Sequence, residues 1–281
     1  MASLGDRMKT YEKESMDISQ IDPSSSYILR LDGSCFSKFT KPFKKPFDDI
    51  FLRIMINTTK DLLQHTKAVT AYTHSDEITL VFDKAEKNDD IERVHIYNGR
   101  VFKIISLTAG YCSARFNYWL QYYLKDIKDA TDDYYDKRDT INRIAKSSPC
   151  FDCRLIVFPN NEEIVNHMIW RSIHDCYRNC IQGHGQHKYG PKNIFGLNNK
   201  QIKDKLYTDG INIDEIPLHY RYGTFIKRVL LDKEITFFNK KTKKDETIDV
   251  KRSSTKEFSI KLDRADDVSC KLIMSKYYDE T

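Results

Sequence analysis

Two aspartates stand where short apolar segments end, in an arrangement that suits phosphoryl chemistry. Asp32 closes the apolar run Tyr27 to Asp32 and precedes Gly33, whose missing side chain lets a ligand approach the backbone. Asp76 lies in the polar turn His74-Ser75-Asp76, between β-branched and aromatic segments that predict a hairpin. Such a pair forms a minimal two-metal site for phosphoryl transfer. The alternative, that both aspartates only stabilise turns, is left open by spacing alone.

Charged neighbours bear on the same hypothesis. Glu77 directly follows Asp76, and adjacent carboxylates repel each other unless cations neutralise them. Arg100 and Lys103 are three residues apart on a helix expected from about Gly99 to Asn117, so they share a polar face. They are either two ordinary surface cations or a pair that grips phosphates over the hairpin carboxylates.

The composition indicates an ordered chain of modest positive charge. Its 281 residues can bury a sizeable core, and an aromatic content of 12% argues against disorder except at the ends. The net charge of +5 comes from 46 basic and 41 acidic residues, so it matters only where cations cluster. Clusters occur at 41–45, 184–192, 200–205 and 240–244. They suggest a polyanionic partner, although charge runs are more often solvated surface.

The ends and the apolar segments indicate a cytoplasmic location. No stretch approaches the roughly 20 apolar residues of a membrane span. The polar segment Met1 to Asp22 carries several acidic residues and fits neither a secretory signal nor an Arg-rich transit peptide. We therefore expect a cytoplasmic protein, with a mitochondrial one as the alternative.

The seven cysteines are an odd number, so reduced thiols are expected. Cys150-x-x-Cys153 and Cys176-x-x-x-Cys180 are spaced as a zinc site would require. However, Cys153 falls in a strand-like run, and the second pair lies on the apolar face of an expected helix. The favoured interpretation is that these cysteines act as small hydrophobic residues.

The element pattern predicts an α+β fold. The order is strand, helix, hairpin, helix, strand, helix, which suggests a sheet with helices on one face. The expected helices are Asp49 to about His65, Gly99 to Asn117, Asn160 to about Gln182, and a short one around Gln201 to Tyr207. Residues 126–148 are expected to form a loop or an exposed insertion, and residues 183–199 are expected to form a basic loop. Later strands are expected at 224–231, 235–238, 247–250 and 257–262.

These elements suggest four segments. Residues 1–26 form a lead-in, and 27–182 form the catalytic domain. Residues 183–232 hold the basic loop, a helix and a closing strand, and 233–281 form a β-rich C-terminal extension.

Read together, several motifs resemble the tRNA-histidine guanylyltransferase superfamily, whose members add nucleotides to RNA in the 3′-to-5′ direction. The matching pieces are Arg30-Leu31-Asp32-Gly33-Ser34-Cys35-Phe36-Ser37, Ser75-Asp76-Glu77, Asn98-Gly99-Arg100-x-x-Lys103, Phe151-Asp152-Cys153-Arg154, Trp170-Arg171, Asp175-x-x-Arg178-Asn179 and Tyr222-Gly223-Thr224. The resemblance spans residues 5 to 230 and keeps its order along the chain, so it is more specific than any single motif.

The resemblance implies a polymerase-palm-like antiparallel sheet and two Mg²⁺ ions. Asp32, Asp76 and the carbonyl of Gly33 would be metal ligands, with Glu77 acting beside them. The nucleotide-binding residues would be Arg30, Asp32, Gly33, Ser34, Cys35, Phe36, Ser37, Lys45, Ser75, Asp76, Arg100, Lys103 and Asn179. The RNA-binding residues would be Arg154, Arg171, Asp175, Arg178 and Lys188.

The resemblance implies that the substrates are tRNA, ATP, and GTP or another NTP. It also implies a homo-oligomer, with a tetramer as the expected assembly. ATP would adenylylate a 5′-monophosphate, and the 3′-hydroxyl of the incoming nucleotide would attack that end.

One departure bears on the substrate. Members dedicated to histidine tRNA carry a His-x-Asn-Asn-Leu-Tyr-Asn-type run, whereas this chain has Asp175-Cys176-Tyr177-Arg178-Asn179-Cys180-Ile181. This run is similar to the like-protein branch, which favours template-dependent repair of tRNA 5′ ends. The alternatives are the dedicated guanylyltransferase, another palm enzyme such as a nucleotide cyclase, and a non-catalytic tRNA-binding protein. The last would be expected to lose the carboxylates that this chain keeps.

Overall fold

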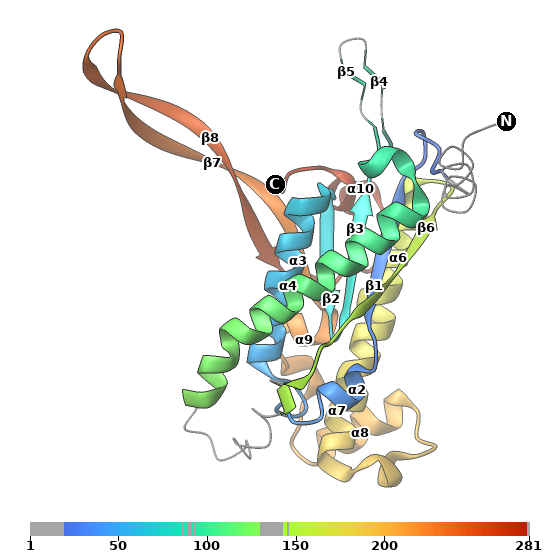
Figure 1. The fold of residues 1–281 in the computed structure, drawn as a ribbon. Helices are drawn as coiled ribbons and strands as arrows, with labels where there is room; N and C mark the ends of the chain where they lie inside the picture. The colour runs from blue at the N-terminus through green and yellow to red at the C-terminus, as the bar shows by residue number, and fades with distance from the viewer. Residues whose placement is uncertain are drawn as a thin grey trace, which may run out of the picture.

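One antiparallel sheet organises the computed structural model, which describes residues 20–85, 87–88, 91–92, 94–129, 143–144 and 146–279. Its six strands lie in the order β6-β1-β3-β2-β7-β8 (Figure 1). Their bounds are β1 Tyr27–Gly33, β2 Thr70–His74, β3 Glu77–Phe82, β6 Phe151–Val157, β7 Thr224–Asn239 and β8 Lys244–Phe258. A separate small ribbon pairs β4 (Lys87–Asn88) with β5 (Ile91–Glu92). The expected α+β class with an antiparallel sheet is confirmed.

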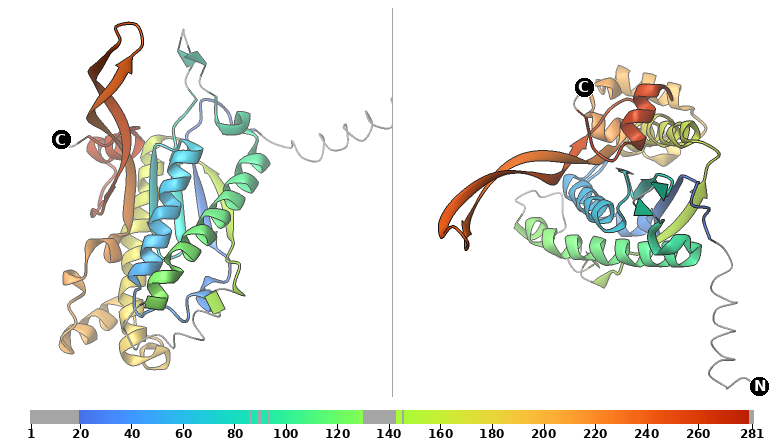
Figure 2. Two further views of the ribbon diagram at one scale, coloured as in Figure 1. Left: turned by 60° about the vertical axis from the view of Figure 1, so that its left-hand side comes forward. Right: turned by 90° about the horizontal axis from the view of Figure 1, so that it is seen from above.

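Helices cover both faces of this sheet, not the one face expected. The main helices are α3 Asp49–Thr66, α4 Val101–Asp129, α6 Asn161–Ile169, α7 Tyr177–Tyr189, α8 Asn199–Thr208 and α10 Asp267–Met274. Shorter ones are α2 Phe36–Phe39, η1 Ile96–Gly99, η2 Trp170–Cys176, η3 Pro191–Ile194, η4 Ile213–Glu215 and α9 Leu218–Tyr222. Seen from above, the sheet lies between α3 with α4 and α6 with α10 (Figure 2).

Strand alternation explains the two layers, because successive side chains point to opposite faces. Leu29 and Leu31 of β1 belong to the larger core, under α3 and α4. Ile28 belongs to a second core with Val165 of α6 and Ile273 of α10. The sequence pattern missed this second layer because α10 belongs to a C-terminal segment read as strands.

Several expected bounds are confirmed, and others change. The strand at Tyr27, the hairpin at His74 and the helix from Asp49 are present, and Asp48 caps that helix through its side chain. The helix expected to end at Asn117 continues to Asp129, and the basic loop at 183–199 is helical up to Tyr189. Residues 1–19 of the lead-in and 130–142 of the insertion lie outside the described residues.

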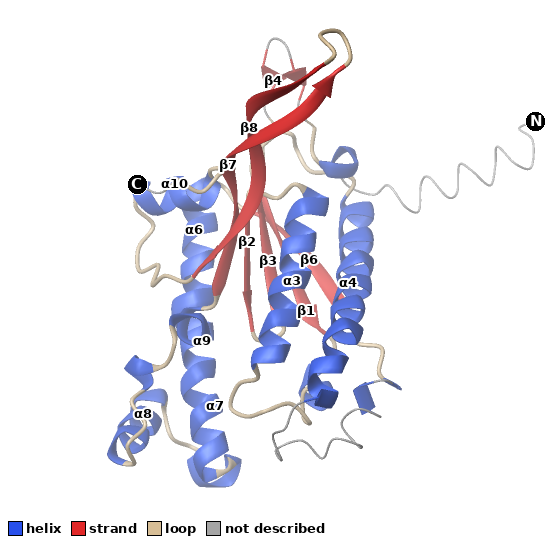
Figure 3. Ribbon diagram, turned by 90° about the vertical axis from the view of Figure 1, so that its left-hand side faces the viewer, coloured by secondary structure: helices blue, strands red, loops and turns tan. Residues whose placement is uncertain are grey.

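β7 and β8 form one long ribbon that projects beyond the sheet (Figures 1 and 3). The expected break near Asp232 is wrong, because pairing runs without interruption to Asn239 and Lys244. Charged residues at 232–234 do not end a strand whose two faces are both exposed to solvent there. The turn comes where the side chain of Asn239 accepts from the backbone amide of Lys241, at 2.9 Å.

Two adjacent cations of β7 fasten helix ends to opposite faces of the sheet. Lys227 is fully buried and donates to the Thr70 hydroxyl at 3.0 Å and to the carbonyls of Leu272 and Ser275, at the end of α10. Arg228 donates to the carbonyls of Leu63 and Ala68, at the end of α3. Cations at helix C-termini satisfy carbonyls that have no intrahelical partner. The C-terminal segment is therefore part of the core.

This contact predicts the behaviour of Lys227→Met. The substitution leaves buried carbonyls without a donor, so the free energy of unfolding should fall by about 2–4 kcal/mol. Urea unfolding followed by circular dichroism measures it. Lys251→Met, on the exposed ribbon, should change stability by less than about 0.5 kcal/mol. Equal small effects in both variants would contradict the capping role.

Candidate functional site

The two aspartates expected to hold metal lie at the same end of the sheet. Asp32 is the penultimate residue of β1 and pairs across the strands with Glu77 of β3. Asp76 lies in the two-residue turn between β2 and β3, after Ser75, whose φ of 50° is left-handed. The Gly33 amide donates to the Asp76 carbonyl at 3.1 Å, which fixes the turn against the end of β1. The strand end that carries Asp32 and the turn that carries Asp76 are therefore neighbours.

Electrostatics at this end favour a cation. Burial raises the pKa of Asp76, and Asp32 and Glu77 add to the effect, while the Ser75 hydroxyl opposes it. Burial also raises the pKa of Asp32, followed by the charge of Glu77. A divalent cation would reverse both effects because it favours the ionised carboxylates.

The donor set fits Mg²⁺. Within the described ranges, no group of three or more His, Cys, Asp or Glu side chains is arranged to hold a metal. Mg²⁺ is usually bound by one or two carboxylates together with water and substrate phosphates. Asp32, Asp76 and the Gly33 carbonyl would thus hold the ion, with phosphate oxygens completing its coordination.

Glu77 is engaged by two arginines. Its carboxylate accepts from Arg30 Nε and Nη2, each at 3.0 Å, in a bidentate pair. Arg171 forms a second ion pair with it. These contacts use both carboxylate oxygens of Glu77. Glu77 was expected to act beside the metal site, and its contacts fit a positioning role there, because it holds the two arginines next to the aspartates.

Arg171 and Asp175 lie on a seven-residue π-helical segment, η2, that joins α6 to α7. Single π-helical turns often mark functional sites. The row containing them could have been a solvated helix face, but Arg171 is 4% exposed and Asp175 is 7% exposed. Arg171 bridges Glu77 and Asp175, so the pair faces the sheet. Their expected contact with RNA is not supported by these positions, because burial separates both side chains from solvent.

A cavity of about 310 Å³ opens beside the hairpin turn. It is lined by Lys45 from the loop before α3, Ser75 from the turn and Asn179 from α7. Three residues expected to bind nucleotide, from distant parts of the sequence, therefore meet at one hollow of a size that suits a small ligand.

The loop after β1 contributes backbone more than side chains. Phe36 is buried among aromatic rings of the main core, with Phe116 at 5.2 Å between ring centroids. Any Cβ on Gly33 would lie 2.4 Å from the Phe36 ring, so this position requires glycine. The Ser34 amide donates to the Cys150 carbonyl at 2.9 Å. The Phe36 side chain is thus unavailable to a nucleotide, while neighbouring Cys35 and Ser37 are exposed.

Arg100 and Lys103 are not brought to the carboxylates. Arg100 bridges to Gln20, and the Gly99 carbonyl accepts from the Ile21 amide, before β1 begins. Asp32 is next to the last residue of β1, and the Gly33–Asp76 hydrogen bond places Asp76 at the same end. This end of β1 faces α2 (Figure 1). A strand of this length spans about 20 Å. Within one copy, the geometry does not support the expected grip of these cations on phosphates over the hairpin.

The remaining RNA candidates are accessible. The side chains of Arg154 and Arg178 are 57% and 54% exposed, and Lys188 is exposed on α7. The zinc alternative is not supported among the described residues. Cys153 packs toward the main core, and Cys180 belongs to a third core under α8.

Sequence reasoning gave no role to His74, although it precedes the Ser75-Asp76 turn. Its imidazole is buried, and within the described structure neither ring nitrogen has a hydrogen-bond partner. Burial lowers the pKa of His74 to about 3, so the ring is neutral at pH 7. Its position beside the turn was the one available signal.

The ion-pair bridge predicts the effect of Arg171→Met. Glu77 and Asp175 would keep their charges without the buried guanidinium, so stability should fall by about 3–5 kcal/mol in denaturant unfolding. Arg178→Met is the matched control, because Arg178 pairs with the same Asp175 at 3.2 Å but is half exposed. That variant should lose less than about 1 kcal/mol. Equal losses would show that burial does not decide the strength of these pairs.

Comparison with known proteins agrees with this geometry. Residues 5–159 match the family model described as tRNAHis guanylyltransferase. An uncharacterized protein of Acanthamoeba polyphaga mimivirus is 38% identical over 98% of this chain and 90% of its own length. The tRNA(His) guanylyltransferase of Debaryomyces hansenii is 25% identical over 79% of this chain and 78% of its own.

Solved structures give the same relationship. A bacterial tRNA(His) guanylyltransferase-like protein in complex with ATP superposes with a TM-score of 0.67 and 30% identity, covering 80% of this chain and 88% of the other. The same kind of protein in complex with GTP gives 0.60 and 26%, covering 88% and 91%. Because the family model, the relatives and the solved structures agree, and because two aspartates lie at the end of the sheet, the chain belongs to the tRNA(His) guanylyltransferase family of nucleotidyltransferases.

Proposed function

We propose that this protein is a template-dependent 3′–5′ nucleotidyltransferase that repairs the 5′ ends of tRNA. The observation that carries the proposal is that Asp32 and Asp76 lie together at the sheet end, next to a cavity that the adjacent Ser75 lines together with Asn179. Bacterial relatives have been solved with ATP and with GTP, the two kinds of nucleotide that such a reaction uses.

The chemistry has two steps. An oxygen of the RNA 5′-monophosphate attacks the α-phosphorus of ATP, and pyrophosphate leaves. The 3′-hydroxyl of the incoming NTP then attacks the activated 5′-phosphorus, losing its proton, and AMP leaves. Bound Mg²⁺ would lower the pKa of attacking hydroxyls and neutralise leaving groups. The chain itself places the carboxylates, shapes the nucleotide cavity and orients the reacting groups for in-line attack.

The residues 175–180 support repair over dedicated guanosine addition. Tyr177 donates to Asp214 at 3.1 Å and accepts from Lys203 at 2.9 Å, so it fastens α7 to α8 and η4. Cys176 and Cys180 are buried. Arg178 and Asn179 are the exposed residues of this stretch, and a site that selects bases by pairing with a template needs no base-specific side chain. The family match favours dedicated guanylyltransferase activity as the second candidate.

Exposed Arg154, Arg178 and Lys188 would contact the tRNA backbone, since cations on a surface attract polyanions. Within the described residues, no helix is both long and apolar enough to cross a bilayer.

The carboxylate assignment predicts that Asp32→Asn and Asp76→Asn each lower the rate of nucleotide addition by about 10²–10³-fold, because a key charged group is lost. Single-turnover assays with labelled NTP measure the rate, and circular dichroism verifies the fold. Asp152→Asn is the matched control: it faces Asp32 across β1 and β6 but is 55% exposed and pairs with Arg154. Near-normal addition by either site variant would refute the assignment.

The repair reading predicts that tRNAs lacking the first 5′ nucleotide accept whichever NTP pairs with the opposing base. Full-length histidine tRNA should be a poorer substrate. Each truncated tRNA is incubated with the four NTPs separately, and the template base is then changed. Guanosine addition that ignores the template and occurs only on histidine tRNA would identify the dedicated activity instead.

A further inference from the structure

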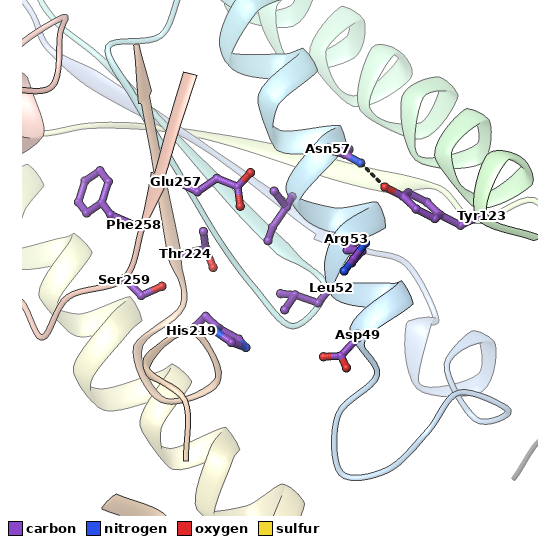
Figure 4. Close-up of a pocket in the computed structure, with 11 residues that line it drawn as sticks. Asp49, Leu52, Arg53, Asn57, Tyr123, His219, Thr224, Glu257, Phe258 and Ser259 are labelled. Carbon is purple, nitrogen blue, oxygen red and sulfur yellow. Dashed lines mark hydrogen bonds between the residues drawn. The ribbon is translucent and has the colours of Figure 1, made fainter. Parts of the chain in front are cut away.

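A second cavity, of about 760 Å³, opens between α3, the start of β7 and the end of β8 (Figure 4). Leu52, Ile56 and Phe258 give it apolar walls, and Arg53, His219 and Thr224 give it polar ones. Leu52 and His219 also line the nucleotide cavity beside the hairpin turn. The two hollows are therefore neighbours across the first turns of α3.

Four of the charged and polar residues that line this cavity have hydrogen-bond or ion-pair partners in the protein: Asp49, Asn57, Tyr123 and Glu257. Glu257 forms an ion pair with Lys60. Asp49 accepts from the Tyr220 hydroxyl at 2.5 Å, and Asn57 donates to the Tyr123 hydroxyl at 2.9 Å. The acidic groups at the rim are thus neutralised or hydrogen-bonded.

Arg53 is different. Its side chain forms no hydrogen bond or ion pair with any residue that the structure describes, and it is exposed at the rim beside Leu52 (Figure 4). Guanidinium groups suit phosphate because their planar donors match its oxygens. The Arg53 guanidinium is therefore placed to receive a phosphate at the rim.

A second unpartnered group lies deeper. Thr224 is 3% exposed, and its hydroxyl has no hydrogen-bond partner within the described structure. The hydroxyl is directed toward His219 (Figure 4). Burial lowers the pKa of His219, so the imidazole is neutral at pH 7 and offers one donor and one acceptor. A buried hydroxyl without a hydrogen-bond partner costs free energy. A nucleobase, whose edges carry hydrogen-bond donors and acceptors, would supply that partner.

We propose that this cavity binds an unpaired nucleotide at the 3′ end of the RNA substrate, with phosphate on Arg53 and base near His219 and Thr224. The inference rests on the proposed function, in which the 5′ end is extended opposite the 3′ strand. In a tRNA that strand continues past the templating base as a single-stranded overhang. The overhang lies next to the reacting end, as this cavity lies next to the nucleotide cavity.

Equilibrium binding to the full-length protein tests the proposal. Fluorescence anisotropy compares a tRNA carrying its complete 3′ end with the same tRNA lacking the unpaired 3′ nucleotides. Arg53→Ala should weaken binding of the complete tRNA about tenfold, because one charge-assisted phosphate contact is lost. The shortened tRNA should lose less than about twofold. Arg264→Ala is the control, because that side chain is 80% exposed and pairs only locally with Asp266.

Thr224→Val provides an independent variant that keeps the side-chain volume. Removing an unpaired buried hydroxyl should maintain or raise the melting temperature, while the complete tRNA binds about threefold more weakly. A purely structural role for Thr224 would not combine an unchanged or higher melting temperature with weaker binding of the complete tRNA.

Three outcomes would overturn the proposal: equal weakening of both tRNAs by Arg53→Ala, no weakening of either, or loss of ATP and GTP binding instead. Because the assay needs no turnover, it is independent of which nucleotide is added. Failure of template dependence would refute the repair function without changing this result.

Discussion

The partly buried pairing of Glu77 with Arg30 and with the buried Arg171 is the contact on which the arrangement of the site depends. Arg30 comes from β1, Glu77 from β3 and Arg171 from the π-helical segment, so one carboxylate joins two neighbouring strands to the helical layer. Breaking such a pair leaves an uncompensated buried charge, which is strongly destabilising. The pairing lies beside the aspartates, so it holds the end of the sheet without using Asp32 or Asp76, the metal ligands that we propose.

The same contact separates the roles of three neighbouring acids. Burial raises the pKa values of Asp32 and Asp76, and the charge of Glu77 adds to both effects, whereas Glu77 itself is paired with guanidinium groups. Carboxylates held in this unfavourable state are a common property of sites that need a cation to become complete. Two adjoining cavities open nearby, one beside Ser75 and one beside Arg53. We propose that the first binds the nucleotide and the second binds the RNA.

The parts of this arrangement that sequence reasoning could predict are those set by local chemistry. The Asp32-Gly33 strand end and the Ser75-Asp76 turn follow from alternation and turn residues, which act over a few positions. The burial of Arg171 could not be predicted, because an i,i+4 row looks the same on a solvated helix as on one facing a charged sheet. The π-helical register that turns Arg171 and Asp175 inward has no recognisable signal in side-chain periodicity.

Long-range contacts account for the other differences. Arg100 and Lys103 were expected near the hairpin because of resemblance and helical spacing, but the direction in which α4 crosses the sheet decides their position. Likewise, Lys227 looks like an ordinary strand cation until α10 returns to cover it. Neither the crossing nor the return is encoded in the residues around those cations.

A crystal structure with Mn²⁺ and a non-hydrolysable NTP would test the central claim most directly. The anomalous signal of manganese locates the ion without reference to the surrounding atoms. We predict ion density contacting Asp32 and Asp76, with the nucleotide in the cavity lined by Ser75 and Asn179 and with Glu77 still paired to Arg30 and Arg171. Manganese bound to Glu77, or nucleotide phosphates held away from both aspartates, would contradict the account.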